Sequence, residues 1–264
     1  AYRGYGNPQV SFARESMIND LCRKMGWDPV KFRYDNVCKP GEKMHANVTP
    51  LSTFPADQCF DNGLRICKEI DQKEGLRDDE QVKEAWGMAL ISHTSSISSL
   101  EGLISSSIIC NPDGTVNLMS GTVDMGQGIE TALVQIAAEK LGIGVSDITH
   151  ADLDTTSSPY NVGSFSSGQA FLAGNAVAFA CEDVIQKIRV ELAKFYHIAE
   201  DQVQYRDKKF QIVQRGRFLD FKEAIKVISN RCRGTLIMGS AVANLVDAPP
   251  PFCLCWAKAA FNKN

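Results

Sequence analysis

The fold is decided by one stretch, Gly121-Thr122-Val123-Asp124-Met125-Gly126-Gln127-Gly128-Ile129-Glu130-Thr131. An apolar run at 115–119 precedes it and is typical of a strand, while apolar side chains at helical spacing follow it over 131–141. A strand, then glycines, then a helix start leaves free backbone N–H groups and the positive end of the helix dipole at one point. This order predicts an anion site, with a tight turn before a capped helix as the alternative.

The glycines in this stretch do not match other phosphate-binding motifs. The third glycine of a dinucleotide fingerprint is missing, and no suitable strand–helix–strand context surrounds the stretch. The Gly-Lys-Ser/Thr of a P-loop is also missing. Gly126 and Gly128 remove side-chain bulk, so a ligand can approach the main chain closely, and the amide of Gln127 can both donate and accept hydrogen bonds.

A second stretch has the same character. Gly163-Ser164-Phe165-Ser166-Ser167-Gly168-Gln169 leads into a long predicted helix, 170–196, whose first half carries mainly small side chains. Serine hydroxyls and free N–H groups at its start again favour an anion, and a serine cap with no further role is the alternative. Two such helix starts in one part of the chain predict a shared polyanionic ligand.

Length and charge limit the classes of function. The chain has 264 residues, of which 44% are hydrophobic, which is enough for one large domain or two small ones. A net charge of −3 without a basic run argues against a nucleic-acid partner. No apolar run is long enough to cross a bilayer, so we expect no membrane partner.

The nine cysteines are scattered and form no Cys-x-x-Cys. No histidine stands at zinc-ligand spacing from them, and the same spacing argues against an iron–sulfur cluster within the chain. Several cysteines lie among apolar residues of predicted helices. We therefore expect buried free thiols in a reducing, cytoplasmic compartment.

The order of predicted elements indicates an α+β fold of mixed sheets packed with helices. Helices are predicted over 10–25, from 29 and over 56–74, and a charged segment at 75–83 follows them. Beyond it the predicted elements are strands at 85–92, 102–110, 115–120, 148–152 and 235–245, a hairpin at 202–213, and a helix at 220–229. The charged segment predicts a boundary between two lobes, 1–80 and 81–264.

The first nine residues, Ala1-Tyr2-Arg3-Gly4-Tyr5-Gly6-Asn7-Pro8-Gln9, predict a loop because they contain two glycines and a proline. Two tyrosines and an arginine favour a binding loop with aromatic walls and a cationic contact, and a frayed terminus is the alternative.

Three motifs together resemble the xanthine dehydrogenase/aldehyde oxidase family. The first nine residues resemble its Ala-aromatic-Arg-Gly-aromatic-Gly-x-Pro-Gln loop, and 124–128 with Thr131 resembles its Met-Gly-Gln-Gly cofactor loop. The third motif, 163–167 followed by Gly174-Asn175-Ala176-Val177, is similar to another cofactor segment of the family. The resemblance covers essentially the whole chain. It implies that 1–80 is the end of a first molybdopterin-binding lobe and 81–264 a second lobe truncated at its C-terminus.

The resemblance also implies roles for individual residues. Met125, Gly126, Gln127 and Gly128 would contact a molybdenum molybdopterin, which in bacterial relatives is often a cytosine dinucleotide. Ser166, Ser167 and Gly168 would bind its pterin or phosphate groups. Arg3 and Gln127 would lie near the metal, which the pterin holds without a direct protein ligand, and Tyr2 and Tyr5 would be aromatic walls for the substrate.

The implied activity is hydroxylation, with water, of an N-heterocycle of purine or nicotinate type or of an aldehyde. Electrons would leave through iron–sulfur clusters and FAD on partner chains or domains. The implied partners are therefore a further molybdenum-lobe chain, an iron–sulfur subunit and an FAD subunit.

The chain departs from the family in one respect that matters for chemistry. The general-base glutamate of relatives stands in a Gly-x-Gly-Glu-like motif that this chain does not contain, so no catalytic residue is assigned within it. One interpretation is a split subunit like the medium molybdopterin subunit of nicotinate dehydrogenase. The other is a non-catalytic, truncated fragment, and it predicts that the apolar segment at 252–256 pairs with residues beyond the chain.

Overall fold

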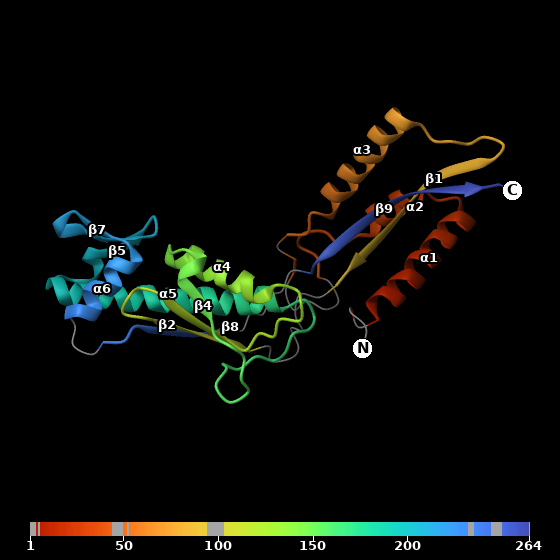
Figure 1. Cartoon of the computed structure of the whole chain (residues 1–264). Coiled ribbons are helices and arrows are strands. Elements are labelled where there is room, and N and C mark those ends of the chain that lie inside the picture. The colour runs from red at the N-terminus through yellow and green to blue at the C-terminus, as the bar shows by residue number, and fades with distance from the viewer. Residues whose placement is uncertain are drawn as a thin grey trace. The chain divides into compact units, whose positions relative to one another are not determined.

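The structure is a computed structural model that describes residues 4, 6–43, 50–51, 53–93, 103–231, 235–243 and 250–263 (Figure 1). The chain divides into two compact units, one formed by residues 1–95 with 247–264 and the other by residues 96–246. The boundary predicted at residue 80 lies inside the first unit, because the strand that follows it stays with the helices. The assignment of 1–80 and 81–264 to two cofactor-binding lobes remains a prediction.

The first unit contains three helices and a pair of strands. They are α1 (Asn7–Met25), α2 (Pro29–Asn36), α3 (Ala56–Glu74), β1 (Val82–Ser92) and β9 (Phe252–Asn262). Gly26 ends α1 in the left-handed conformation, with φ of 69°. The carboxylate of Asp28 begins α2 by accepting hydrogen bonds from the N–H groups of Val30 and Lys31. These caps explain why the end of α1 and the start of α2 are predictable from the sequence, whereas α1 begins at Asn7, inside the segment 1–9 that was predicted as a loop.

Strands β1 and β9 form a two-stranded antiparallel sheet from residues far apart in the sequence. Val82 pairs with Asn262 at one end and Ser92 with Phe252 at the other. Residues 252–256 thus pair with β1, while the other edge of β9 has no strand partner among the described residues, so the expectation that they also pair beyond the chain stays a prediction. One face of the pair packs against α3, where the indole Nε1 of Trp86 donates to the carboxylate of Asp71 at 3.0 Å.

A buried ion pair joins α1, α2 and β1. The Arg33 side chain is almost fully buried, and its Nε donates to Oε2 of Glu15 at 2.7 Å. The same Glu15 oxygen accepts the N–H of Leu90 at 2.9 Å, and the guanidinium of Arg14 donates to the Leu90 carbonyl oxygen. Side chains of α1 therefore satisfy backbone groups at the outer edge of β1, which no strand in the described part of the chain covers.

The second unit is built on a four-stranded sheet with the order β4-β3-β2-β8. Its strands are β2 (Ile104–Cys110), β3 (Val116–Ser120), β4 (Ile148–His150) and β8 (Met238–Ala243), and its helices are α4 (Ile129–Leu141), α5 (Gln169–Tyr196) and α6 (Phe221–Arg231). Strands β3 and β4 are parallel and the other pairs are antiparallel, so the sheet is mixed as predicted. Helices α4 and α5 cover one face of it (Figure 1).

Helix α5 is the centre of this unit. Buried residues recur along its whole length, from Leu172 to Tyr196. Its small side chains bring it close to β8: a Cβ added at Gly239 would lie 2.3 Å from the carbonyl oxygen of Ala180. A small sheet of β5 (Val203–Arg206), β6 (Lys209–Ile212) and β7 (Arg217–Leu219) packs beyond its C-terminal half, and β7 is not apparent from the sequence.

The cysteines follow the sequence expectation only in part. Cys22, Cys67, Cys110 and Cys181 are buried free thiols, whereas Cys59, Cys253 and Cys255 are exposed. Burial raises the pKa of Cys110 and of Cys181 to about 12, so both remain protonated at neutral pH. No helix in the described part of the chain is long and apolar enough to span a membrane.

Candidate functional site

The first predicted cofactor loop, residues 121–128, runs from the end of β3 to the start of α4. Gly126 and Gly128 adopt left-handed conformations, with φ of 96° and 76°, and no atom lies within 4 Å of a Cβ added at either position. Met125 between them is 70% exposed. The two glycines therefore supply a backbone conformation that other residues rarely adopt, and they leave the outer side of the loop open.

The start of α4 is not the open anion site that the sequence predicts. One carboxylate oxygen of Asp124 accepts the N–H groups of Gly126 at 2.8 Å and Gly128 at 3.3 Å, and the other accepts the N–H of Glu130 at 3.4 Å. These hydrogen bonds hold the pKa of Asp124 below its usual value, and the bond from Gly126 contributes most. The chain's own carboxylate therefore occupies the donors that were expected to face a ligand.

The amide of Gln127 is also used within its own loop. Its Nε2 donates to the carbonyl oxygen of Val123 at 3.0 Å, and its Oε1 accepts the N–H of Met125. The sequence-based role of Gln127, a contact near the metal, requires this side chain to turn away from both partners. The described conformation of the loop is thus closed on itself by Asp124 and Gln127.

The second predicted cofactor loop, residues 163–168, leads into α5. Ser166 and Ser167 have positive φ, 52° and 53°, which is uncommon for residues with a side chain. Ser166 is only 5% exposed, whereas Ser167 is exposed. Gly168 is the N-cap residue of α5, and as a glycine it contributes no side-chain cap. The N–H groups at the start of α5 are of the kind that bind anions, although that of Gly168 itself donates to the carbonyl oxygen of Phe165 at 3.2 Å.

The structure brings the two loops together. The Oγ of Ser164 donates to the carbonyl oxygen of Val123 at 3.0 Å, and the Nδ2 of Asn161 donates to the Oγ1 of Thr122 at 3.1 Å. Seven predicted site residues thus lie on two adjoining loops; they are Met125, Gly126, Gln127, Gly128, Ser166, Ser167 and Gly168. The other predicted site residues, Tyr2, Arg3 and Tyr5, lie outside the described residues.

Sequence reasoning missed the residues that shape these loops. Asp124, Asn161 and Ser164 were given no role, although each holds loop backbone. A signal existed for Asp124, because an aspartate just before a helix is a common cap. No comparable signal exists for Asn161, since its partners come from three separate places in the sequence.

The charge around the loops is acidic or neutral. Residues 121–130 and 151–169 contain no lysine or arginine, but they include Asp124, Glu130, Asp152 and Asp154. These loops can therefore offer a polyanion only neutral donors, namely backbone N–H groups, hydroxyls and amides. A ligand with phosphate oxygens and neutral polar edges can pair with these donors at the start of α5. At the start of α4 it can do so only after Asp124 releases the N–H groups that it now accepts.

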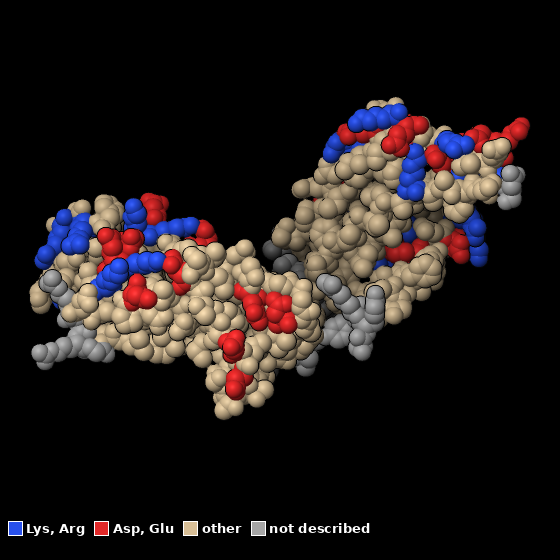
Figure 2. Space-filling model, viewed as in Figure 1, with Lys and Arg blue, Asp and Glu red and all other residues tan. Residues whose placement is uncertain are grey.

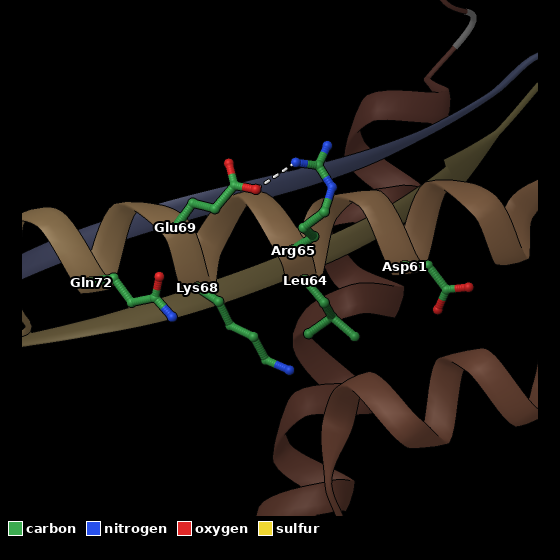
Figure 3. Close-up of a pocket in the computed structure, with 6 residues that line it drawn as sticks. All are labelled: Asp61, Leu64, Arg65, Lys68, Glu69 and Gln72. Carbon is green, nitrogen blue, oxygen red and sulfur yellow. Dashed lines mark hydrogen bonds and ion pairs between the residues drawn. The ribbon is translucent and has the colours of Figure 1, made fainter.

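A hollow elsewhere on the surface does not compete with this site. A shallow hollow of about 380 Å³ lies in the first unit, but α3 alone lines it with residues of both charges (Figure 3). Within it Arg65 and Glu69 form an ion pair at 2.6 Å. Figure 2 shows lysine, arginine and acidic side chains interspersed along the exposed side of α3. Within the described residues, no group of three or more His, Cys, Asp or Glu side chains could hold a metal ion.

A mixed sheet under two helices, with a glycine-containing loop before each helix, defines an α+β domain suited to a large polar ligand. Comparison with known families is consistent with this. Residues 66–244 match the molybdopterin cofactor-binding domain, and residues 1–37 match a second family of the same description. The chain belongs to the molybdopterin cofactor-binding domain family of the xanthine dehydrogenases and aldehyde oxidoreductases. The resemblance stated from the sequence is thereby confirmed.

Individual relatives agree with this assignment. The xanthine dehydrogenase molybdenum-binding subunit of Escherichia coli O157:H7 is 32% identical over 200 residues, which are 75% of this chain and 27% of that protein. The aldehyde oxidoreductase of Megalodesulfovibrio gigas is 28% identical over 218 residues, which are 80% of this chain and 23% of that protein. The chain thus spans about a quarter of the length of these relatives.

The fold is shared with solved structures. Reconstituted CO dehydrogenase from Oligotropha carboxidovorans superimposes with a TM-score of 0.72 at 21% identity, over 97% of this chain and 36% of that chain. The likeness confirms the predicted fold class, α+β with mixed sheets and helices. At this level of identity it carries no information about substrate.

Proposed function

We propose that the chain is the molybdopterin-binding portion of a molybdenum hydroxylase that hydroxylates an N-heterocycle of purine or nicotinate type or an aldehyde. The observation that carries the proposal is the adjoining position of loops 121–128 and 163–168, joined at 3.0 Å by the bond from Ser164 to Val123. Membership of a cofactor-binding family supports a common ligand for these loops. The substrate choice rests on the resemblance of the N-terminal loop and on the relatives' names.

The residues of the two loops would hold different parts of the cofactor. Ser166, Ser167 and Gly168 at the start of α5 suit pterin or phosphate groups, in the free or cytosine-dinucleotide form, through hydroxyls and N–H groups. Met125, Gly126, Gln127 and Gly128 contact it from the first loop. Arg3 contributes a positive charge near the metal, and Tyr2 and Tyr5 are walls for a flat substrate. When bound, the molybdenum group supplies a two-electron oxidation in which an oxygen from water is transferred to carbon.

The remaining parts of the reaction belong to partners. Iron–sulfur and FAD chains or domains accept the electrons, and a further molybdenum-lobe chain supplies the general-base glutamate. We place the complex in the cytoplasm because the buried thiols Cys110 and Cys181 suit a reducing compartment.

The test is the molybdenum and pterin content of the chain, purified from its natural source without separating bound partners. We expect about one molybdenum and one pterin per chain, since each chain carries one pair of adjoining loops. Co-migrating iron–sulfur and flavin subunits would identify the electron acceptors. Material that carries neither metal nor pterin would reject this function and leave the non-catalytic fragment as the account of the chain.

A further inference from the structure

A side-chain amide lies beneath the two loops and uses all of its hydrogen-bonding capacity. The Oδ1 of Asn161 accepts the N–H of Gly163 at 2.8 Å and the Nε2 of Gln169 at 3.1 Å. Its Nδ2 donates to the Oγ1 of Thr122 at 3.1 Å and to the Oε1 of Gln169 at 3.0 Å. A carboxamide has two donors and two main acceptor positions, so Asn161 is fully satisfied.

The partners of Asn161 come from both loops and from the first turn of α5. Thr122 is fully buried in the first loop, and Gln169 is 9% exposed at the first position of α5. Gln169 also donates to the carbonyl oxygen of Gly163, so the second loop is held twice. A buried polar group that loses its partner is destabilised more than an exposed one, and such a network therefore favours a single arrangement.

The segment that carries Asn161 is itself fixed to the sheet. β3 leaves the sheet at Gly121, and residues 160–161 then lie beside the start of β2. Asn161 forms a β-bridge with Ile104, and the N–H of Ser105 donates to the carbonyl oxygen of Tyr160 at 2.9 Å. A Cβ added at Gly121 would lie 2.2 Å from the carbonyl oxygen of Pro159. The end of β3 therefore abuts the segment that supports the second loop, with no room for a side chain.

The residues above this support include two exposed side chains and two unfavourable backbone conformations. Met125 and Ser167 face solvent, and Ser166 and Ser167 both have positive φ. Such conformations persist only where the surrounding structure holds them. Asn161 and Gln169 bond the residues on either side of this segment, so they supply that restraint.

We infer that Asn161, with Thr122 and Gln169, is a positioning residue that fixes the spacing between loops 121–128 and 163–168. A ligand that contacts both loops then finds both in place before it binds. The identity of that ligand as molybdopterin rests on the proposed function, whereas the coupling between the loops does not. Asn161 itself lies beneath the loops and acts through their backbone.

The first test is Asn161→Asp in the purified protein with its bound partners. The change keeps the shape and the acceptor toward Gly163, but it removes both donors and places an oxygen against Oε1 of Gln169. We expect amide hydrogen exchange to accelerate about tenfold in both 121–128 and 163–168. A buried acceptor without a hydrogen bond lowers the free energy of local opening by about the amount that corresponds to a tenfold change in rate. We also expect a smaller amount of molybdenum per chain. Asn117→Asp, on the opposite face of β3, is the matched control and should change neither.

The second test separates positioning from a general loss of stability. Thr122→Val keeps the side chain's shape and removes one hydroxyl from the first loop only. If the network couples the loops, exchange accelerates in the second loop, 163–168, as well as in the first. A merely local role for Thr122 would leave 163–168 unchanged, and that result would overturn the inference. This variant also serves if Asn161→Asp fails to fold.

The outcomes distinguish the inference from the proposed function. Cross-loop acceleration in protein that carries no molybdenum would support the coupling and reject molybdopterin as the ligand. Normal molybdenum content with unchanged exchange in both variants would support the proposed function and overturn the positioning role.

Discussion

At the start of α4, Asp124 takes the position that sequence reasoning reserves for a bound anion. The motif correctly indicates a glycine loop before a helix, and both glycines have a left-handed backbone. The oxygen that accepts the hydrogen bonds of these N–H groups is determined by the side-chain rotamers in the loop, and a sequence motif does not specify rotamers. Loop position could be predicted from the sequence, while the state of its donors could not.

The Asp124 carboxylate should make stability depend on pH. The pKa of Asp124 is lower in the folded chain than its ordinary value of about 3.9, so the ionised form stabilises the fold at neutral pH. This contribution is present above that ordinary value and is lost as pH falls through the lowered value. Asp124→Asn should therefore lower the melting temperature at pH 7, and the difference from wild type should shrink below about pH 4.

Circular dichroism at 222 nm between pH 3 and pH 7 provides the measurement, since α4 and α5 dominate the helical signal of the second unit. Asp152→Asn, which removes an exposed acidic side chain outside the cap, is the control. A difference between wild type and Asp124→Asn that is the same at pH 3 and pH 7 would show that the carboxylate does not cap α4 through its charge.

Among whole elements, the helices follow local rules and the strand partners do not. Helix α3 begins at Ala56 and ends at Glu74, as predicted, because its apolar period and Gly75 both mark it. The partner of β1 is β9, whose pairing with Val82 begins at Asn262. Period and turn residues identify a strand, but they cannot choose between partners that are far apart in sequence.

The ion pair that joins α1, α2 and β1 leads to a prediction for the first unit. Arg33→Met should lower the free energy of unfolding of this unit by about 1.5–3 kcal/mol, because the buried Glu15 carboxylate loses its closest cation and keeps only the ion pair with Arg14 at 3.2 Å. Lys31→Met removes an exposed ion pair with Asp35 and should change it by about 1 kcal/mol or less. These two variants lie on the same short helix and differ mainly in burial.

Tryptophan fluorescence during urea unfolding separates the two variants. The three tryptophans, Trp27, Trp86 and Trp256, all belong to the first unit, so their emission reports its unfolding alone. Equal midpoints for Arg33→Met and Lys31→Met would mean that the buried pair adds nothing beyond a surface contact.

At the scale of the whole molecule, the two units differ in how the chain builds them. The second unit is continuous in sequence, and its main core draws only on residues between Ile104 and Ala243. The first unit joins residues from both ends of the sequence, and its small cluster of Leu51, Phe54 and Ala56 is closed by Phe252. The sequence indicates two parts, but it does not reveal that one is inserted into the other.

Deletion of residues 247–264 should therefore unfold the first unit and spare the second. β1 would lose its only strand partner among the described residues, and Gly63 of α3 would lose the ring of Trp256 that packs against it. We expect the emission of Trp27 and Trp86 to shift to that of solvent-exposed indole. Protection from hydrogen exchange should remain in α4 and α5. Loss of protection in α5 as well would show that the two units do not fold independently.

The pairing of β1 with β9 also sets an order of events at the ribosome. By the time β9 emerges, all of residues 96–246 have been synthesised, and a continuous segment of that size can collapse on its own core. Until then β1, next to the helices of the first unit, has an unpaired edge. Such an edge is the kind of surface that molecular chaperones recognise and that aggregates when unprotected. Slow translation between β1 and β9, or limited chaperone supply, would thus selectively lower the amount of correctly folded first unit.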